Sequence, residues 1–109
     1  MKFFKPKKQH HSLDVPVLVR FWPEDGVWNA SAMDIPVAVF GDTFEEARSH
    51  FEEALARHIE ILCEMNQMDQ TIKILSKAAK DREFYDRIPA QQPFERYLVD
   101  REGLRFAHV

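Results

Sequence analysis

The stretch GDTFEEARSHFEEALARHIEIL, residues 41–62, restricts the fold of this chain more than any other feature. One set of positions recurs at steps of three and four residues, which is the spacing of one face of an α-helix. This mostly apolar stripe comprises Phe44, Ala47, Phe51, Ala54, Leu55, His58, Ile59 and Leu62. The opposite face carries Glu45, Glu52, Glu53, Glu60 and Glu64. Such a helix has to bury its apolar stripe against another layer of structure, and a small sheet is the expected partner.

The start of this helix is marked by its own residues. Thr43 can accept a hydrogen bond from the first turn, and Glu46, three residues later, completes a capping box. Asp42 adds negative charge near the positive end of the helix dipole. Gly41 ends the preceding strand-like run. We therefore assign helix-capping and structural roles to Gly41, Asp42, Thr43 and Glu46.

Three runs of strand-forming residues precede the helix. In the first, VPVLVRFW (15–22), apolar residues alternate, which puts Trp22 on the face opposite the set Val15, Val17, Val19 and Phe21. PEDG (23–26) is a turn that leads to a second strand, VWNASAM (27–33). DIPVAVFG (34–41) begins as a turn and becomes a third, short strand.

The rest of the chain predicts a second helix and a hairpin. NQMDQ (66–70) is a break, after which Asp69 is expected to cap a helix running from Gln70 to about Tyr85. A linker at 88–93 leads to two strands around the turn DREG. The predicted fold class is α+β: a three-stranded antiparallel sheet backed by one long helix (β-β-β-α), then a second helix and a C-terminal strand or hairpin.

Length and charge indicate one domain with a divided charge pattern. With 109 residues, we expect a basic N-terminal arm (1–14), a β-β-β-α core (15–65) and a C-terminal extension of the same domain (66–109). Residues 12–65 hold eleven acids against three arginines, a net charge of -8, which favours a basic partner over nucleic acid. No apolar run approaches the ~20 residues of a membrane span, and Cys63 is the one cysteine. We therefore expect a cytoplasmic protein that is not associated with a membrane.

Catalytic and metal sites are not expected. The acids Asp14, Glu24, Asp25 and Asp34 fall at strand ends or turns, where such residues usually serve the turn. His50 and His58 are eight positions apart, whereas a helical metal pair needs four. Cys63 has no Cys or His at zinc-ligand spacing and is expected to be a small buried apolar residue. The sequence thus predicts no enzyme, no metal and no cofactor.

Three stretches in this order resemble the N-terminal domain of the HicB-like antitoxin family. They are EDGVW (24–28), MDIPV (33–37) and GDTFEEA (41–47), and the resemblance extends over about residues 15–63. It implies a partial ribonuclease-H-like fold, β-β-β-α-β, without that enzyme's chemistry. It also implies a bacterial toxin–antitoxin system, in which the protein binds a small basic toxin that cleaves messenger RNA and masks the toxin's active-site histidine.

The resemblance further implies a homodimer or higher homo-oligomer. The C-terminal part does not look like the DNA-binding attachments of the family, which weighs against operator DNA as a partner. Candidate partner contacts are the acids Asp25 and Asp34, together with Trp28, which would be an anchor if it lies on the sheet face that the helix leaves open. Two alternatives are kept: a stand-alone HicB-like protein of structural or regulatory role that only self-associates, and a metal-dependent nuclease derived from the same fold.

Overall fold

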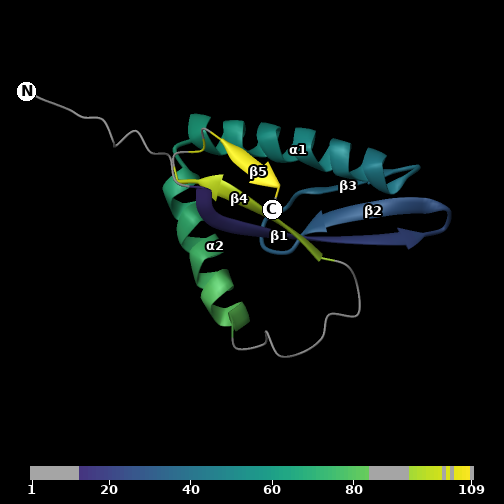
Figure 1. The fold of residues 1–109 in the computed structure, drawn as a ribbon. Helices are drawn as coiled ribbons and strands as arrows, with labels where there is room; N and C mark the ends of the chain where they lie inside the picture. The colour runs from purple at the N-terminus through teal and green to yellow at the C-terminus, as the bar shows by residue number, and fades with distance from the viewer. Residues whose placement is uncertain (1–12, 84–93, 102, 104, 109) are drawn as a thin grey trace, which may run out of the picture.

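The computed structural model describes residues 13–83, 94–101, 103 and 105–108. Its strands are β1 (Leu13–Glu24), β2 (Val27–Ala32), β3 (Ala38–Gly41), β4 (Phe94–Asp100) and β5 (Phe106–His108). They form one antiparallel sheet in the order β3-β2-β1-β4-β5. The helices are α1 (Phe44–Glu64) and α2 (Met68–Glu83), and Figure 1 shows both beside the sheet. The α+β class predicted from the sequence is confirmed.

β1 is the central strand, and its alternating pattern decides which face of the sheet is buried. Val15, Val17, Val19 and Phe21 are at most 1% exposed, as the alternation predicts. The strand turns into β2 through a two-residue loop, because Glu24 pairs with Val27. Asp25 and Gly26 in this loop have φ angles of 55° and 81°, and two positive values are what a type I′ hairpin turn requires.

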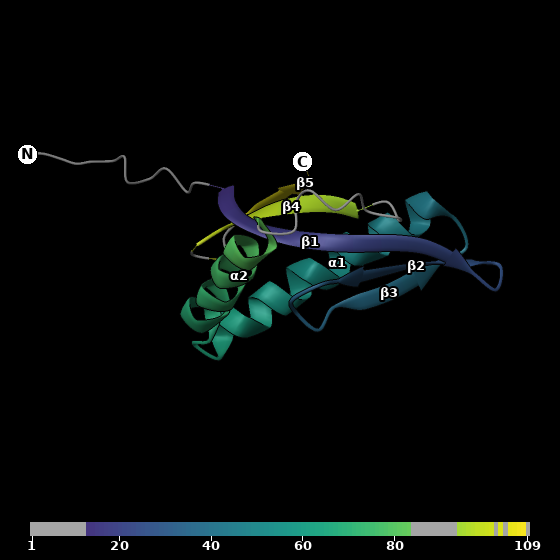
Figure 2. The same ribbon diagram turned by 90° about the horizontal axis from the view of Figure 1, so that it is seen from below.

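α1 lies on the buried face of the sheet, with β3 along one flank and the β4–β5 hairpin on the other (Figures 1 and 2). Near its start, the ring of Phe44 lies 4.9 Å from that of Phe21. In its middle, the ring of Phe51 lies 5.4 Å from that of Tyr97 on β4. The buried residues of the helix belong to the predicted stripe: Ala47, Phe51, Leu55, Ile59 and Leu62.

α2 lies beside the N-terminal part of β1, as Figures 1 and 2 show. It buries Met68, Thr71, Ile72 and Leu75. The helix begins two residues earlier than predicted, so Asp69 is in its first turn and does not precede it. In that position the carboxylate still complements the positive end of the helix dipole.

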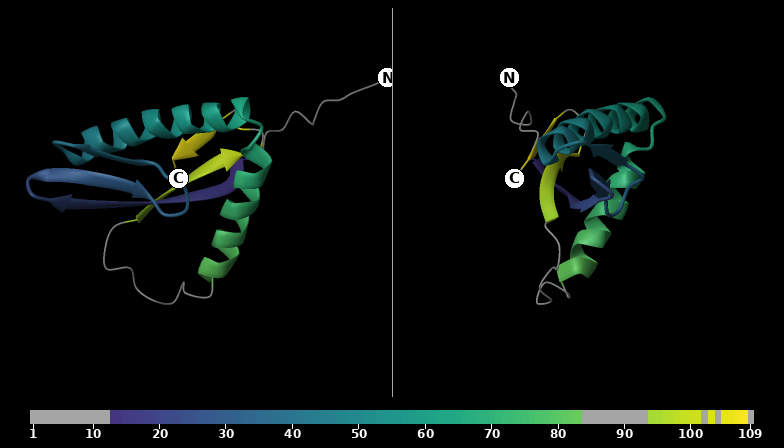
Figure 3. Two further views of the ribbon diagram at one scale, coloured as in Figure 1. Left: turned by 180° about the vertical axis from the view of Figure 1, so that it is seen from behind. Right: turned by 90° about the vertical axis from the view of Figure 1, so that its right-hand side faces the viewer.

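The predicted three-stranded sheet is wrong, because the sheet has five strands. The C-terminal hairpin pairs with β1, where Val17 lies opposite Tyr97. β3 runs parallel to β1. One helix after β3 would bring the chain back to the end of the sheet where β3 starts, so the next strand would also run parallel to β1. α2 follows α1 instead, and β4 starts at the opposite end, where Phe94 pairs with Arg20. β4 is therefore antiparallel to β1, and Figure 3 shows how the sheet curls between the two helices.

The third run begins as a turn and becomes a short strand, as predicted. Residues 33–36 form a bend, and the strand begins only at Ala38, after a hydrogen bond from the amide of Ala32 to the carbonyl of Val37 at 2.9 Å. Pro36 has no amide hydrogen to donate to a strand ladder, which fits its place in the bend. Residues 1–12 of the predicted arm, the linker at 88–93 and the predicted helix end near Tyr85 lie outside the described residues.

Candidate partner-binding site

The outward side of α1 is an acidic face made of Glu45, Glu53, Glu60 and Glu64. All four side chains are exposed, because they lie on the side of the helix opposite its buried stripe. Arg57 is the one exposed arginine or lysine of α1, a helix that the structure describes in full. Arg57 lies four residues after Glu53 and offsets part of this charge, but four glutamates against one arginine leave a net negative face that a positively charged partner would complement.

The capping residues fix where this acidic face begins. The hydroxyl Oγ1 of Thr43 accepts a hydrogen bond from the amide of Glu46 at 3.0 Å. The carboxylate of Glu46 accepts one in return from the amide of Asp42 at 2.8 Å, one residue before the cap. A Cβ on Gly41 would lie 2.6 Å from the amide nitrogen of Ala47, so the end of β3 touches the backbone of the helix. The strand and the helix are thereby held at a fixed angle.

A polar network joins α1 to the last two strands. Nη2 of Arg48 donates to both oxygens of Glu95, at 2.8 and 2.9 Å. The imidazole Nε2 of His108 pairs with Oε1 of the same carboxylate. Hydrogen bonding to Glu95 raises the pKa of the Arg48 guanidinium. The network therefore ties β4 and β5 to the second turn of the helix.

Tyr97 lies directly beneath this network. It is fully buried, and its hydroxyl donates to Oε2 of Glu52 at 2.8 Å. Burial is the main cause that raises the pKa of the Tyr97 phenol, and the hydrogen bond to Glu52 adds to it. Its ring contacts those of Phe106 and His108, with centroids 6.0 and 5.0 Å apart. Because both carboxylates already accept hydrogen bonds, the arrangement serves to fix β5 against α1.

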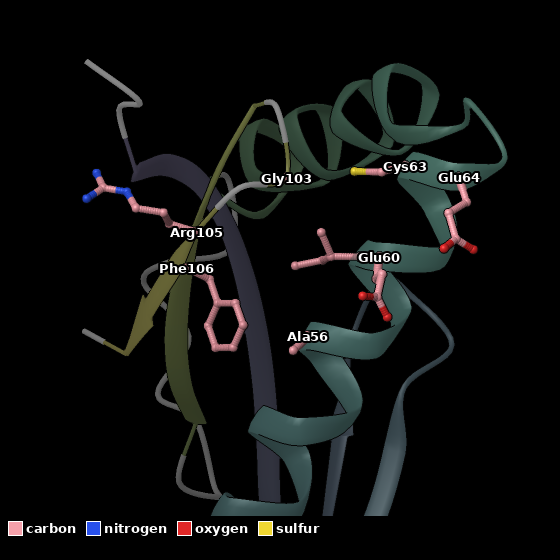
Figure 4. A pocket seen from close by; sticks show the side chains of 8 residues that line it. Ala56, Glu60, Cys63, Glu64, Gly103, Arg105 and Phe106 are labelled. Atoms are coloured by element: carbon pink, nitrogen blue, oxygen red, sulfur yellow. The ribbon is translucent and has the colours of Figure 1, made fainter. Parts of the chain in front are cut away.

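A pocket of about 370 Å³ opens between the C-terminal half of α1 and the β4–β5 hairpin (Figure 4). Ala56, Ile59 and Phe106 give it apolar walls, and Glu60 and Glu64 of the acidic face stand on its rim. The remaining lining residues are Cys63, Gly103 and Arg105. Figure 4 shows the ring of Phe106 directed toward the helix and the side chain of Arg105 directed away from the pocket.

Gly103 allows the hairpin to come close to the end of α1. Its φ of +74° is in the left-handed region, which glycine adopts at little steric cost. A Cβ there would lie 2.7 Å from Sγ of Cys63 and 3.0 Å from Cγ2 of Ile59. The prediction that Cys63 is buried is wrong, because this side chain is exposed. It belongs to the last turn of α1, on the side that faces the pocket and not the sheet.

The two predicted acidic contacts are far apart. Asp25 is exposed in the hairpin turn before β2, and Asp34 is half-buried in the bend after it. β2 separates them, so their backbones lie roughly 20 Å apart, given about 3.3 Å per strand residue. The structure does not bring Asp25 and Asp34 together, and their role in partner binding stays a prediction.

Trp28 lies on the helix side of the sheet. Its ring meets that of Phe44 edge to face, with centroids 5.4 Å apart. Trp28 was expected to anchor a partner only if it lay on the open face of the sheet, and it does not lie there. Trp22 occupies the open face instead, with the guanidinium of Arg20 4.3 Å from its ring and its Nε1 donating to Glu24 at 3.0 Å.

The pocket and the polar network went unrecognised in the sequence because their members are distant along the chain. Arg48 and Glu95 are 47 residues apart, and no local pattern marks either as a pair. Among the residues that the structure describes, no group of three or more His, Cys, Asp and Glu side chains could hold a metal ion. In the same part of the chain, neither helix is long and apolar enough to cross a membrane.

Comparisons with protein-family models, with curated proteins and with solved structures find no match to this chain. A proposal of function therefore depends on the acidic face, the pocket and the resemblance of the sequence stretches described above.

Proposed function

We propose that this chain is a HicB-like antitoxin-type protein, which binds a small basic RNA-cleaving protein and masks its active site without catalysing a reaction. The acidic face of α1 is the observation that carries the proposal. A protein that cleaves RNA needs positive charge to hold phosphates. Exposed carboxylates in a row on a rigid helix complement such a surface, which speeds encounter and excludes acidic competitors.

The way α1 is held favours binding by a preformed surface. The helix is fixed at its start by the Thr43 cap and in its second turn by the pair between Arg48 and Glu95. A surface that is already ordered loses little conformational entropy on binding. The backbone that carries these carboxylates is thus in place before a partner arrives.

A stand-alone, self-associating HicB-like protein is the second candidate, and one observation favours it. Phe40, on the edge strand β3, is 64% exposed. Large apolar side chains on an edge strand are common at contacts between copies of a chain. In this alternative, assembly would be the function and a basic partner would be absent.

Co-expression with any small basic protein that proves to be encoded beside this chain separates the two. We expect the two proteins to co-purify, and the growth defect caused by the basic protein to disappear. Glu53→Lys on the acidic face should weaken the complex by at least tenfold in isothermal titration. Asp81→Lys is a matched control, because Asp81 is exposed on α2 and away from the acidic face, and it should change affinity by less than twofold.

Equal losses for the two variants would remove the acidic face from the interface. A homo-oligomer that forms without any basic protein bound, and that Phe40→Ser dissociates, would favour the second candidate.

A further inference from the structure

We infer that the pocket between α1 and the β4–β5 hairpin takes one apolar side chain of the basic partner, while basic residues next to that side chain pair with Glu60 and Glu64. The inference rests on the proposed function and adds to it the place and the chemistry of the anchor. The partner segment would be a short stretch with a phenylalanine or a branched aliphatic residue between lysines or arginines.

The walls of the pocket define the anchor. Ala56 and Ile59 come from α1 and Phe106 from β5, so an entering side chain meets apolar surface on both sides. The volume of about 370 Å³ is at the small end of ligand pockets, which suits one large side chain more than a cofactor. Side chains that fill such pockets usually supply most of the affinity of an interface.

The rim of the pocket defines the neighbours of the anchor. Glu60 and Glu64 are one helical turn apart and both exposed, and Figure 4 shows their carboxylates on the α1 side of the opening. Arg105, the one base among the described residues that line the pocket, points away from the opening. Positive charge on the incoming segment is therefore complementary to this rim.

A second pocket, on the other flank of α1, does not fit the same partner. It has about 240 Å³ and lies near the bend that precedes β3. Arg57 and His58 are on its lining, and none of the described residues that line it is an acid. A basic segment would thus be selected by the larger pocket and repelled by the smaller one.

Contacts behind the larger pocket hold it open before a ligand enters. Phe106 is packed against Tyr97, and the network of Arg48, Glu95 and His108 fastens β5 to α1. Gly103 lets the hairpin close the far end, since a side chain there would collide with Cys63. A preformed pocket avoids the ordering that weakens binding to a flexible one.

Peptide binding tests the inference on the whole chain. The probes are three fluorescent five-residue peptides: phenylalanine between two pairs of lysines, serine between the same lysines, and phenylalanine between two pairs of glutamates. We expect fluorescence anisotropy to show at least tenfold weaker binding for the serine peptide and no saturable binding for the glutamate peptide. Equal affinity for the phenylalanine and serine peptides would overturn the inference.

A substitution that fills the pocket, compared with the same substitution outside it, tests the inference a second way. Ala56→Trp places a large ring at an exposed pocket position of α1 and should weaken binding of the phenylalanine peptide at least tenfold. Ser49→Trp adds the same ring at an exposed position of α1 outside the pocket lining, and should change affinity by less than twofold. Circular dichroism of both variants shows whether the fold is retained. Equal effects of the two tryptophans would contradict the inference.

Cys63 supplies a readout without any mutation, because it is the one cysteine of the chain and lines the pocket. A saturating concentration of the phenylalanine peptide should slow alkylation of Cys63 by iodoacetamide at least fivefold. An unchanged rate would show that the peptide binds elsewhere and would overturn the inference.

Failure of the inference can be told apart from failure of the proposed function. If Ala56→Trp leaves the complex with the co-purified basic protein intact while Glu53→Lys disrupts it, the acidic face binds the partner and the pocket is not the anchor. If the phenylalanine peptide enters the pocket but no basic protein co-purifies, the proposed function fails and the selectivity of the pocket stands.

Discussion

Replacing Tyr97 with phenylalanine removes one hydroxyl from the contact between α1 and β4. That hydroxyl is the donor in the 2.8 Å hydrogen bond to Glu52. A hydrogen bond to a charged group contributes about 1.5–3 kcal/mol, and because Glu52 is only half-buried we expect the lower part of that range, about 1.5–2 kcal/mol. For a chain of this length, this corresponds to a melting temperature lower by roughly 5–10 °C.

The raised pKa of Tyr97 gives the same contact a pH dependence. Below the ordinary tyrosine pKa of about 10, the phenol is protonated in both states and the stabilising hydrogen bond is present. Above it, the unfolded chain releases the proton while the folded chain holds it, so the free energy of unfolding falls by up to about 1.4 kcal/mol per pH unit. Tyr97→Phe removes this contribution, so the stability difference between the two proteins should shrink as the pH rises above 10.

Two measurements check this reasoning. Urea unfolding of both proteins at pH 7 and at several values above 10 gives the stability difference, and absorbance at 295 nm follows phenolate formation in the folded state. Glu52→Gln is the control, because its amide oxygen still accepts the hydrogen bond. Equal stability of Tyr97→Phe and the wild type at pH 7, or a Tyr97 phenolate that forms near pH 10, would refute the account of this contact.

Three further substitutions test the packing around α1. Gly41→Ala should destabilise the protein by about 1–3 kcal/mol in urea unfolding, because the new Cβ meets the backbone of Ala47 at 2.6 Å; an unchanged midpoint would contradict the close approach. Thr43→Ala should lower the free energy of unfolding by about 1 kcal/mol, whereas Thr43→Ser should retain the cap and most of the stability. Phe51→Ala should cost about 3–5 kcal/mol, a large part of the total for a small domain, since the ring is fully buried; a loss below about 1 kcal/mol would argue against the packing of α1 on the sheet.

Local patterns predicted the parts of the fold that local interactions determine. The stripe around Phe51 and Leu55 correctly predicted the buried side of α1, because helical periodicity and a helix cap both depend on residues that are close together in the sequence. The Asp25–Gly26 turn joins β1 to β2 for the same reason. In contrast, no local pattern indicates that Tyr97 pairs with Val17. The number of strands in the sheet and the direction of β4 therefore could not be predicted from the sequence.

The candidate site divides in the same way. The sequence predicted Glu45, Glu53, Glu60 and Glu64 of the acidic face, because they share one side of the helix, but it wrongly added Glu52, which is half-buried and accepts the hydrogen bond of Tyr97. The pocket depends on the approach of Gly103 to Cys63 and on the network that fastens His108, and these contacts exist only after the hairpin has joined the sheet. Trp28 faces α1 because its strand register places it opposite Gly41, next to the start of the helix. Sequence alternation alone could not assign that face.

We propose that the acidic face of α1 is where a basic partner binds. Backbone amide chemical shifts, recorded while the co-purified basic protein is added, test it most directly. We predict that the largest changes fall on Glu53, Glu60 and Glu64 and on the hairpin around Phe106. Changes confined to the open face of the sheet around Trp22 and Phe40, or no changes at all, would contradict the claim.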